Sequence, residues 1–381
     1  MFNGDRSAKY PNEQDMVHEG IPFINAGDLE NGCVNLLNAN KITTEKYNDL
    51  GGAKLQLGDI VYCLRGTLGK NAYIDNFSEG TVASSLVAIR PKNIDGKYLF
   101  YILNSDIEYS QRILHDEGAA QPNLSAKSVS EFIIPIPNID EQKKLSSFFD
   151  SLSNLITLHQ RKYDKLQVLK KAMLEKMFPK NGSSVPEIRF KGFTDAWEQR
   201  KVGDLLIERN QQAPMSDEYP LMAFIANEGV APKGERYDRS ALVTDTVNKL
   251  YKKTEKGDFI YSSNNLETGS IGLNKYGKAC ISPVYSIFEP TGIADSDFLG
   301  RRLVRKDFIN AMVKWRQGVI YGQWRIHESD FLKIEITVPS VEEQRKIGTY
   351  LDQLDNLITL HQRELEKLQN IKKSMLEKMF V

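Results

Sequence analysis

The sequence has 381 residues, of which 41% are hydrophobic and 26% are charged, and its formal net charge is zero. This length predicts two or three domains, and the composition excludes a wholly disordered chain. No run approaches the roughly 18 apolar residues of a membrane span, no signal peptide follows Met1, and three widely spaced cysteines exclude a disulfide framework, so we expect a cytoplasmic protein.

Residues 1–137 form the first predicted module, in which short alternating apolar runs lie between Gly, Asn and Asp residues. Residues 58–62 predict a strand, a glycine-rich loop follows at 66–73, and residues 87–91 predict another strand. A helix is predicted over residues 97–115. The module has 12 basic and 17 acidic residues, a net charge of −5 that disfavours strong binding to phosphates by this module alone.

Residues 138–178 predict one long helix. Asn138 stands three residues before Glu141, which is a capping-box pattern, and Pro179 ends the helix. Leucine, histidine and methionine recur every seven residues, which indicates a coiled coil. The members of this seam are Leu145, Leu152, His159, Leu166 and Met173, with Phe148, Leu155 and Leu169 at the second seam position.

A linker at residues 179–189 leads into the second predicted module, residues 190–339. Residues 257–261 and 286–290 predict strands that match those of the first module, with a glycine-rich loop at 269–276, and residues 307–317 predict a helix. A lead-in segment, Phe190–Asp204, has no counterpart before the first module. We therefore expect the first module to lack its opening segment.

Residues 340–381 predict a second long helix that repeats the first. Residues 137–178 and 339–380 align at an offset of 202, with 25 of 42 positions identical. His159 and His361 occupy the middle of each seam. They are compatible with metal binding or pH sensing, but no Cys, Asp or Glu recurs at ligand spacing, so a polar seam residue that fixes the register is favoured and no metal site is predicted.

Signatures of catalysis are missing from the sequence. It contains no G-x-x-x-x-G-K-[ST], G-x-G-x-x-G, H-E-x-x-H or G-x-S-x-G motif, and the glycine-rich loop at residues 66–70 is too short for a phosphate loop. We therefore expect no enzymatic activity from this chain alone.

The loops of both modules instead carry side chains that can read base edges or hold phosphates. Arginine pairs with guanine, and asparagine or glutamine pairs with adenine, through two hydrogen bonds. Solvated loops with turn-forming residues remain an equal alternative at this point. The candidate residues are Arg65, Lys70, Asn71, Gln121, Asn123 and Lys127 in the first module and Asn264, Asn265, Asn274, Lys275, Gln323, Trp324 and Arg325 in the second.

Taken together, these features resemble the specificity subunit of type I restriction-modification systems. The resemblance rests on the duplication, the proline and Glu-Gln start of each helix (residues 137–142 and 339–344), the repeated Met-Leu-Glu-Lys-Met-Phe ending, and the lead-in at 190–197. It implies an α+β fold: two similar target-recognition domains of mixed β-sheet and helices, separated by two long helices that form an antiparallel coiled coil with pseudo-two-fold symmetry.

The resemblance also implies a function and partners. Each domain would read one half of a bipartite double-stranded DNA target, while two methyltransferase subunits and restriction/translocase subunits perform the chemistry. This chain would hold no cofactor, because S-adenosylmethionine, ATP and Mg belong to the partners. We expect the partners to dock on apolar residues beside the seams, namely Phe149, Ile156, Tyr163, Leu351, Ile358 and Leu365.

Two other interpretations remain open from the sequence. The acidic first module favours a non-enzymatic coiled-coil scaffold that binds protein partners through its two modules. A self-contained nuclease or methyltransferase would require a catalytic constellation that the sequence does not contain.

Overall fold

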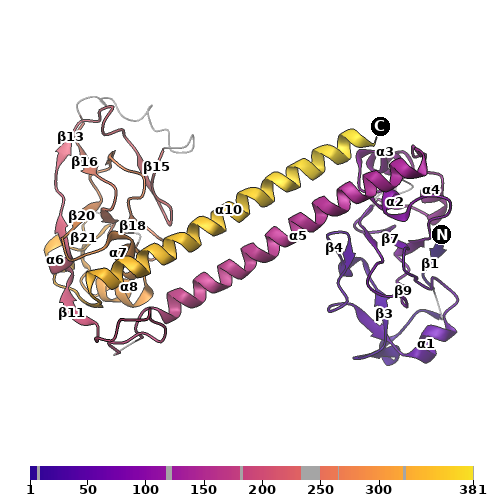
Figure 1. The fold of residues 1–381 in the computed structure, drawn as a ribbon, viewed down its shortest axis with the longest axis horizontal. Coiled ribbons are helices and arrows are strands. Elements are labelled where there is room, and N and C mark those ends of the chain that lie inside the picture. Colours follow the sequence, from indigo (N-terminus) through magenta and orange to yellow (C-terminus); the bar gives the residue numbers. More distant parts are fainter. Residues whose placement is uncertain are drawn as a thin grey trace. The chain divides into compact units, whose positions relative to one another are not determined.

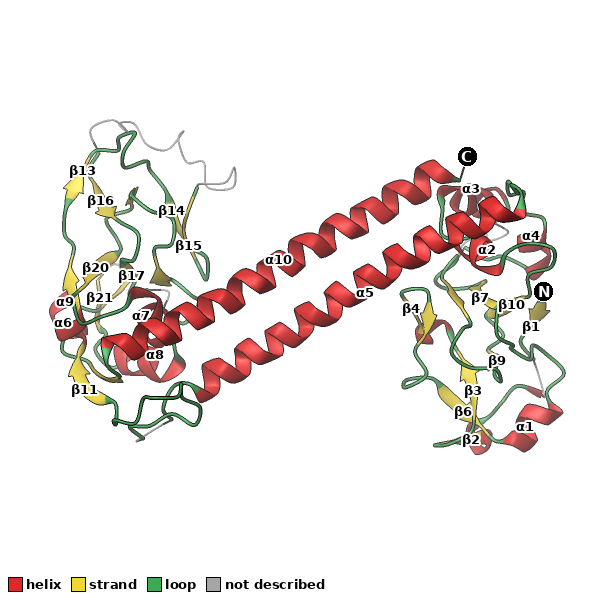
Figure 2. Cartoon of the chain, viewed as in Figure 1, coloured by secondary structure: helices red, strands yellow, loops and turns green. Residues whose placement is uncertain are grey.

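The computed structural model describes residues 1–6, 9–116, 122–180, 183–232, 249–264, 266–320 and 323–380. The chain divides into two compact units (Figures 1 and 2). Unit 1 comprises Met1–Lys162 and His361–Val381, and unit 2 comprises Tyr163–Leu360. The two long helices, α5 (Ile139–Lys176) and α10 (Val341–Met379), therefore each contribute one half to either unit. Among the described residues, no helix is long and apolar enough to cross a membrane.

Unit 1 contains two four-stranded sheets, a short hairpin and four short helices. The first sheet has the antiparallel order β1 (Phe2–Asn3), β10 (Leu86–Ile89), β7 (Ile60–Cys63), β8 (Asn71–Tyr73). The second has the order β2 (Met16–Val17), β6 (Asn40–Ile42), β3 (Ile21–Ile24), β9 (Thr81–Val82), in which β3 and β9 are parallel. The hairpin is β4 (Leu29–Glu30) with β5 (Cys33–Val34), and the helices are α1 (Thr44–Asp49), α2 (Gly96–Ile102), α3 (Asp106–Leu114) and α4 (Ala126–Ser130).

Strand β7 is buried on both faces, because its alternate side chains enter two different cores. Ile60 and Tyr62 pack with residues of α2, and Val61 packs with Ile24 and Val82 of the second sheet. A strand covered on both sides is continuously apolar, which explains the unbroken run of β7.

Unit 2 repeats the first sheet of unit 1 and adds other strand pairs. The repeated sheet has the order β12 (Leu206–Glu208), β20 (Ser286–Pro290), β17 (Phe259–Tyr261), β18 (Ile271–Leu273). The other groups are β13 (Gln212–Ala213) with β16 (Tyr251–Thr254) and β19 (Ala279–Ile281), β14 (Ala223–Ile225) with β15 (Gly229–Ala231), β11 (Glu198–Lys201) with β23 (Glu335–Val338), and β21 (Gln317–Ile320) with β22 (Gln323–Arg325). The helices are α6 (Val202–Leu205), α7 (Ser296–Arg302), α8 (Lys306–Val313) and α9 (Glu328–Phe331).

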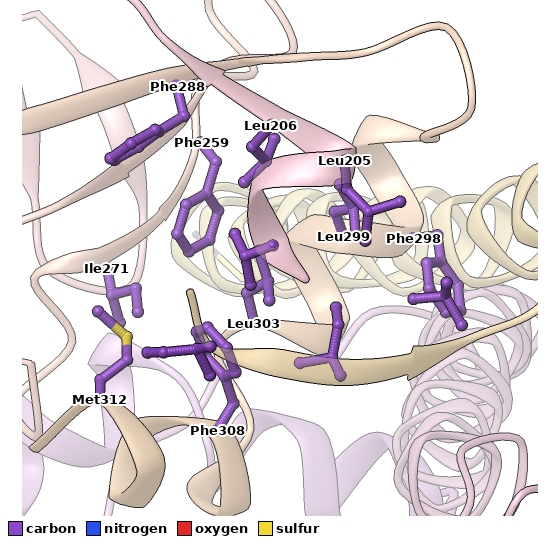
Figure 3. Packing of buried hydrophobic residues seen from close by; sticks show 14 of the residues in the cluster. Leu205, Leu206, Phe259, Ile271, Phe288, Phe298, Leu299, Leu303, Phe308 and Met312 are labelled. Atoms are coloured by element: carbon purple, nitrogen blue, oxygen red, sulfur yellow. The ribbon is translucent and has the colours of Figure 1, made fainter. Parts of the chain in front are cut away.

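The main core of unit 2 lies between the repeated sheet and helices α6, α7 and α8. In Figure 3, Phe259 and Phe288 of the sheet lie beside Leu206, while Leu303 and Phe308 approach them from the helical side. All five side chains are buried. Burial of large apolar side chains is the dominant favourable contribution to the stability of such a unit.

The predicted α+β fold with two similar modules and two long helices is confirmed. The single helix predicted at residues 97–115 is wrong, because the chain forms α2 and α3 with a break between them at which Ser105 caps α3. The predicted helix at 307–317 ends at Val313, and Gln317 already belongs to β21. Side-chain caps and turn bonds that decide such breaks are short-range features within an otherwise helical pattern.

The glutamine of the repeated Glu-Gln pair joins the start of each long helix to its own module. In unit 1 the side chain of Gln142 accepts a hydrogen bond from the Asp95 amide (2.8 Å) and donates one to the Pro137 carbonyl (2.8 Å). In unit 2 Gln344 makes the same bonds with Asp295 (3.0 Å) and Pro339 (3.0 Å). Buried amides need such partners, which explains why the glutamine recurs.

The repeated Met-Leu-Glu-Lys-Met-Phe endings pack on the module of the other repeat. Phe178, at the end of the first long helix, stacks on Phe298 in unit 2, with ring centroids 5.4 Å apart. Phe380, at the end of the second, stacks on Phe149 in unit 1 at 5.6 Å. Within each unit the two helical segments are therefore antiparallel, and each core contains residues from both repeats.

Candidate nucleic-acid interface

Two loops meet at one edge of unit 1. The loop after β7 and the stretch before α4 are joined by a bridge between Arg65 and Asn123, and the amide of Leu124 donates to the carbonyl of Leu64 (3.0 Å). The Arg65 Nε donates to the Asn123 Oδ1 at 3.0 Å. Arg65 is exposed, and among the described residues its other guanidinium nitrogens have no hydrogen-bond partner, so this pair presents an arginine and an amide together.

The corresponding two loops meet in unit 2, where asparagine stands at the place of arginine and arginine at the place of asparagine. The amide of Ile326 donates to the Ser263 Oγ (3.0 Å), which joins the loop after β17 to strand β22. By their places in the two units, Asn264 corresponds to Arg65, and Arg325 corresponds to Asn123. Arg325 is exposed, whereas Asn264 is half-buried and its Oδ1 is a buried atom without a hydrogen-bond partner among the described residues.

Ion pairs support these loops, buried in unit 1 and partly exposed in unit 2, and the sequence interpretation missed them. In unit 1 the Tyr62 hydroxyl donates to the Glu108 carboxylate, which also accepts from the Arg112 Nε at 3.0 Å. Burial and the neighbouring carboxylate raise the pKa of Tyr62, so its hydroxyl stays protonated as a donor. In unit 2 Arg316 makes two 2.7 Å bonds to Glu267. The i, i+4 spacing of Glu108 and Arg112 on a helix was the signal available for the first pair.

The prediction that Asn71 and Asn274 contact DNA is wrong, because both side chains are buried and bond groups within their own units. The Asn71 amide donates to the carbonyls of Gly69 (2.8 Å) and Leu103 (3.0 Å), and its Oδ1 accepts from Asn104 (2.8 Å). Asn274 is completely buried. It bonds Thr254 (3.1 Å) and the Gly277 carbonyl (2.8 Å), and its Oδ1 accepts from the Tyr276 and Gly277 amides. Both side chains are buried and both of their amide N–H groups are already bonded, so neither can read a base.

The predicted alignment of the two glycine-rich loops is also shifted by three residues. Strand pairing places Asn71 opposite Tyr62, whereas the residue opposite Tyr261 is Ile271. Asn71 therefore corresponds to Ile271, not to Asn274. The pattern Gly-x-Asn recurs at residues 69–71 and 272–274, so sequence similarity favoured the wrong register.

The predicted lysines differ in their surroundings. Lys70 donates to the Ala26 carbonyl at 3.0 Å, and Lys275 is paired with Asp352 of α10 at 2.6 Å, so both have partners within their units. Lys127 remains exposed, 4.0 Å from Glu131. Gln121 and Asn265 lie outside the described residues. The backbones of Gln323 and Trp324 belong to β22, and their side chains are outside the description as well.

Most residues predicted to contact partners lie inside the units. Phe149 and Leu351 are completely buried, Ile358 and Leu365 are buried, and Ile156 and Tyr163 are half-buried. This prediction is wrong for the buried four. Phe149 and Leu351 pack in the cores of their modules, with the face of each helix that was expected to be free. The exposed apolar residues are members of the repeated segment 155–161, Leu155 and Leu158, and their copies Leu357 and Leu360.

The histidines of the two repeats form a pair in unit 1. The Nδ1 atoms of His159 and His361 are 3.1 Å apart. Among the described residues, no group of three or more His, Cys, Asp or Glu side chains could hold a metal ion. The pair is consistent with the expected polar contact that fixes the helix register.

Fold and site together define a duplicated α+β protein whose two modules present the same pair of loops with different side chains. The family model described as "Type I restriction modification DNA specificity domain" matches residues 1–168 and 194–370. The chain belongs to this family.

Curated relatives agree with this assignment, and a solved structure has the same fold. The chain is 25% identical over 324 residues to the type I restriction enzyme MjaVIII specificity subunit of Methanocaldococcus jannaschii, covering 78% of this chain and 73% of that protein. It is 23% identical over 377 residues to a second specificity subunit of that organism, MjaX, covering 94% and 85%. The crystal structure of the type I restriction-modification S subunit from M. genitalium has the same fold, with a TM-score of 0.58, 16% identity, and coverage of 100% of this chain and 94% of that one.

Proposed function

We propose that this chain is the DNA-recognition subunit of a type I restriction-modification complex, in which each unit reads one half of a bipartite target. The observation that carries this proposal is the duplicated loop pair, which presents the exposed Arg65 with Asn123 in unit 1 and the exposed Arg325, beside the loop that contains Asn264, in unit 2. Arginine suits guanine and asparagine suits adenine in the major groove. The two units share the same pair of loops but carry different side chains at matching positions, which supports two half-sites of different sequence.

Partner subunits are part of this proposal. Two methyltransferase subunits and the restriction/translocase subunits carry out catalysis, with S-adenosylmethionine, ATP and Mg bound by them. The docking surface for the methyltransferases is the exposed leucine pair of the repeated segment, Leu155 with Leu158 and Leu357 with Leu360. Two identical copies of one surface support two identical partners. The neutral charge of the chain also favours DNA binding within the complex over binding by the chain alone.

The test compares two arginine variants in the complex with its methyltransferase. Binding is measured on a library of double-stranded DNA at fixed salt. Arg65→Ala relaxes the sequence preference at one half-site and Arg325→Ala at the other, each costing about 1–3 kcal/mol for a lost bidentate contact. Lys127→Ala is the matched control, because an exposed lysine that contacts a phosphate weakens all sequences alike.

Uniform weakening by both arginine variants would contradict base reading. Binding that shows no dependence on salt or sequence in the wild-type complex would instead support the protein scaffold.

A further inference from the structure

Unit 2 contains a cavity at a place where unit 1 contains an aromatic side chain. The cavity has a volume of about 700 Å³, within the range of about 300–1,000 Å³ that is typical of ligand sites. Its lining includes residues of the hairpin β14–β15, strand β18, helices α7 and α8, and the two long helices. Every described lining residue belongs to unit 2, so the cavity lies within one packed unit.

Helices α2 and α7 occupy equivalent places in the two units, which identifies the counterpart of Gly300 in the cavity wall. Each helix is capped by an aspartate, Asp95 in unit 1 and Asp295 in unit 2. The backbone amide of each aspartate also donates to the glutamine at the start of a long helix. The offset between the two helices is therefore 200, and Phe100 is the counterpart of Gly300.

In unit 1 the ring of Phe100 lies between strand β8 and the hairpin β4–β5. Its centroid is 6.0 Å from that of Tyr73 in β8. Its Cζ is so close to Gly32 of the hairpin that a Cβ on this glycine would be 2.7 Å away. The Tyr73 amide donates to the Gly32 carbonyl at 3.0 Å, so strand and hairpin also contact each other directly.

The matching walls are present in unit 2, and the space between them is the cavity. Leu273 of β18 is the counterpart of Tyr73 by strand pairing. A Cβ on Gly229 of the hairpin β14–β15 would lie 2.6 Å from the Leu273 carbonyl, so this hairpin reaches the same place on the sheet. A Cβ on Gly300 would lie 3.2 Å from the Leu273 Cβ, so a side chain at position 300 would point toward the sheet as Phe100 does. Glycine at this position therefore leaves room for a ring that the chain itself supplies in unit 1.

The apolar part of the lining suits an aromatic ring. Leu266 and Ile271 are buried and Ile309 is half-buried, and all three line the cavity. An engineered cavity lined by Leu, Ile and Phe binds benzene, because water gains no hydrogen bonds in such a space. Val304, 38% exposed, also lines the cavity, so the site opens to solvent there.

The charged part of the lining favours an anionic substituent on the ring. Five lysine or arginine side chains line the cavity, against three carboxylates. Two of these carboxylates are already paired, Asp355 with Lys170 at 2.6 Å and Glu267 with an arginine outside the lining. Lys306 is exposed and has no ion-pair partner among the described residues. A cleft with an excess of positive charge concentrates anionic ligands.

We propose that unit 2 binds a small aromatic acid in this cavity. The ring takes the place that corresponds to Phe100, between Gly300 and Leu273, and the acid group pairs with Lys306. The proposal depends on contacts within unit 2 and is independent of DNA recognition.

The test titrates the full-length chain with naphthoate by isothermal titration calorimetry. The expected result is saturable binding of one molecule per chain. Cyclohexanecarboxylate has the charge without the aromatic ring, and naphthylmethanol has the ring without the charge, so each should bind about tenfold or more weakly than naphthoate.

Two variants fill the cavity from different sides. Gly300→Phe supplies the side chain of unit 1 and should abolish binding of naphthoate. Val304→Trp enlarges a partly exposed side chain and should weaken binding about tenfold or more, without requiring Leu273 to move. Circular dichroism monitors folding of both proteins.

A charge reversal tests the position of the acid group. Lys306→Glu should weaken binding of naphthoate about tenfold or more and leave naphthylmethanol unaffected. Lys314→Glu is the matched control, because Lys314 is an exposed lysine at the end of α8 that does not line the cavity. Absence of naphthoate binding, or undiminished binding to folded Val304→Trp protein, would overturn the proposal. Equal loss in the two lysine variants would also overturn it, because the charge effect would then be unspecific.

Discussion

Asparagine has opposite roles at neighbouring positions of the loops. Asn71 and Asn274 turn inward and bond backbone carbonyls, whereas Asn123 lies at the edge of unit 1 and bonds the exposed Arg65. The inward residues stabilise loops whose glycines have positive φ, such as Gly69 at 79°. A Cβ on Gly69 would lie 2.8 Å from the Glu108 carboxylate, so that position also requires glycine for space.

The burial of Asn71 predicts an effect on stability. Asn71→Ala removes three hydrogen bonds and leaves the Gly69 and Leu103 carbonyls without this donor, at a cost of about 1–3 kcal/mol. Urea unfolding measures the change, with Lys127→Ala as the exposed control from the same module. An Asn71→Ala protein with wild-type stability and an altered base preference would contradict the structural role.

The sequence predicted the repeated scaffold better than the site. The strand at Ile60–Cys63 and the start of each long helix follow from local patterns of apolar residues, turns and caps. The roles of Asn71 and Arg325 depend on which segments distant in sequence meet, and a local pattern does not encode that meeting. Recurrence in both modules identified two loops that meet in each unit, but it could not distinguish an inward amide from an outward one.

At the scale of elements, the repeated helix segment combines an exposed and a covered face. Leu155 is exposed, whereas Ile358, from the copy of the segment in α10, is buried in unit 2. The seven-residue pattern identified a seam but assigned its second position to Leu155, which is on the exposed side. Where the start of α10 packs on its module, the buried face includes Leu351, which lies beside the predicted seam and not on it.

The exposed leucines predict where partner binding can be disrupted. Leu155→Asp combined with Leu357→Asp is expected to abolish co-purification with the methyltransferase, because a charge replaces apolar surface in the proposed interface. Thr157→Asp with Thr359→Asp is the matched control, since both threonines are exposed in the same repeated segment. Circular dichroism monitors folding. Full co-purification of the folded leucine variant would refute the assigned surface.

The histidine pair predicts a dependence of stability on pH. Burial, followed by the nearby His159 and Lys162, lowers the pKa of His361 below its usual 6.5. As the pH falls below about 6.5, the unfolded chain therefore takes up a proton that the folded chain resists, and stability decreases. His361→Gln should reduce the loss measured by urea unfolding between pH 7.5 and 5.5. His18→Gln, at an exposed position, should not, and an equal loss in all three proteins would contradict this account.

At the scale of the whole molecule, each unit is completed by the end of the other repeat's helix. Phe178 contributes to unit 2 and Phe380 to unit 1, with each ring stacked on an aromatic residue of that unit. The 202-residue duplication is therefore not a duplication of independently closed domains. The sequence repeat ends where each long helix ends, whereas each packed unit combines one half of both helices.

Because the end of each long helix packs in the module of the other repeat, two equivalent substitutions should destabilise different modules. Phe178→Ala should destabilise unit 2 and Phe380→Ala unit 1, each by about 3–5 kcal/mol for a buried phenylalanine. The three tryptophans, at positions 197, 315 and 324, all belong to unit 2. Tryptophan fluorescence should therefore detect the lower stability of unit 2 in the Phe178→Ala protein. Circular dichroism should detect the lower stability of unit 1 in the Phe380→Ala protein. An early tryptophan transition in the Phe380→Ala protein would argue against the exchanged packing.

The position of Phe380 also sets an order of events during translation. A ribosome adds about 5–20 residues per second, and domains usually fold in the order of their synthesis. Unit 2 receives all of its residues once Leu360 has been made, whereas unit 1, which includes Phe2, waits for Phe380. The nascent chain therefore keeps the aromatic surface around Phe149 uncovered until the ribosome has passed that codon. The module that is translated first is the one that can be completed last.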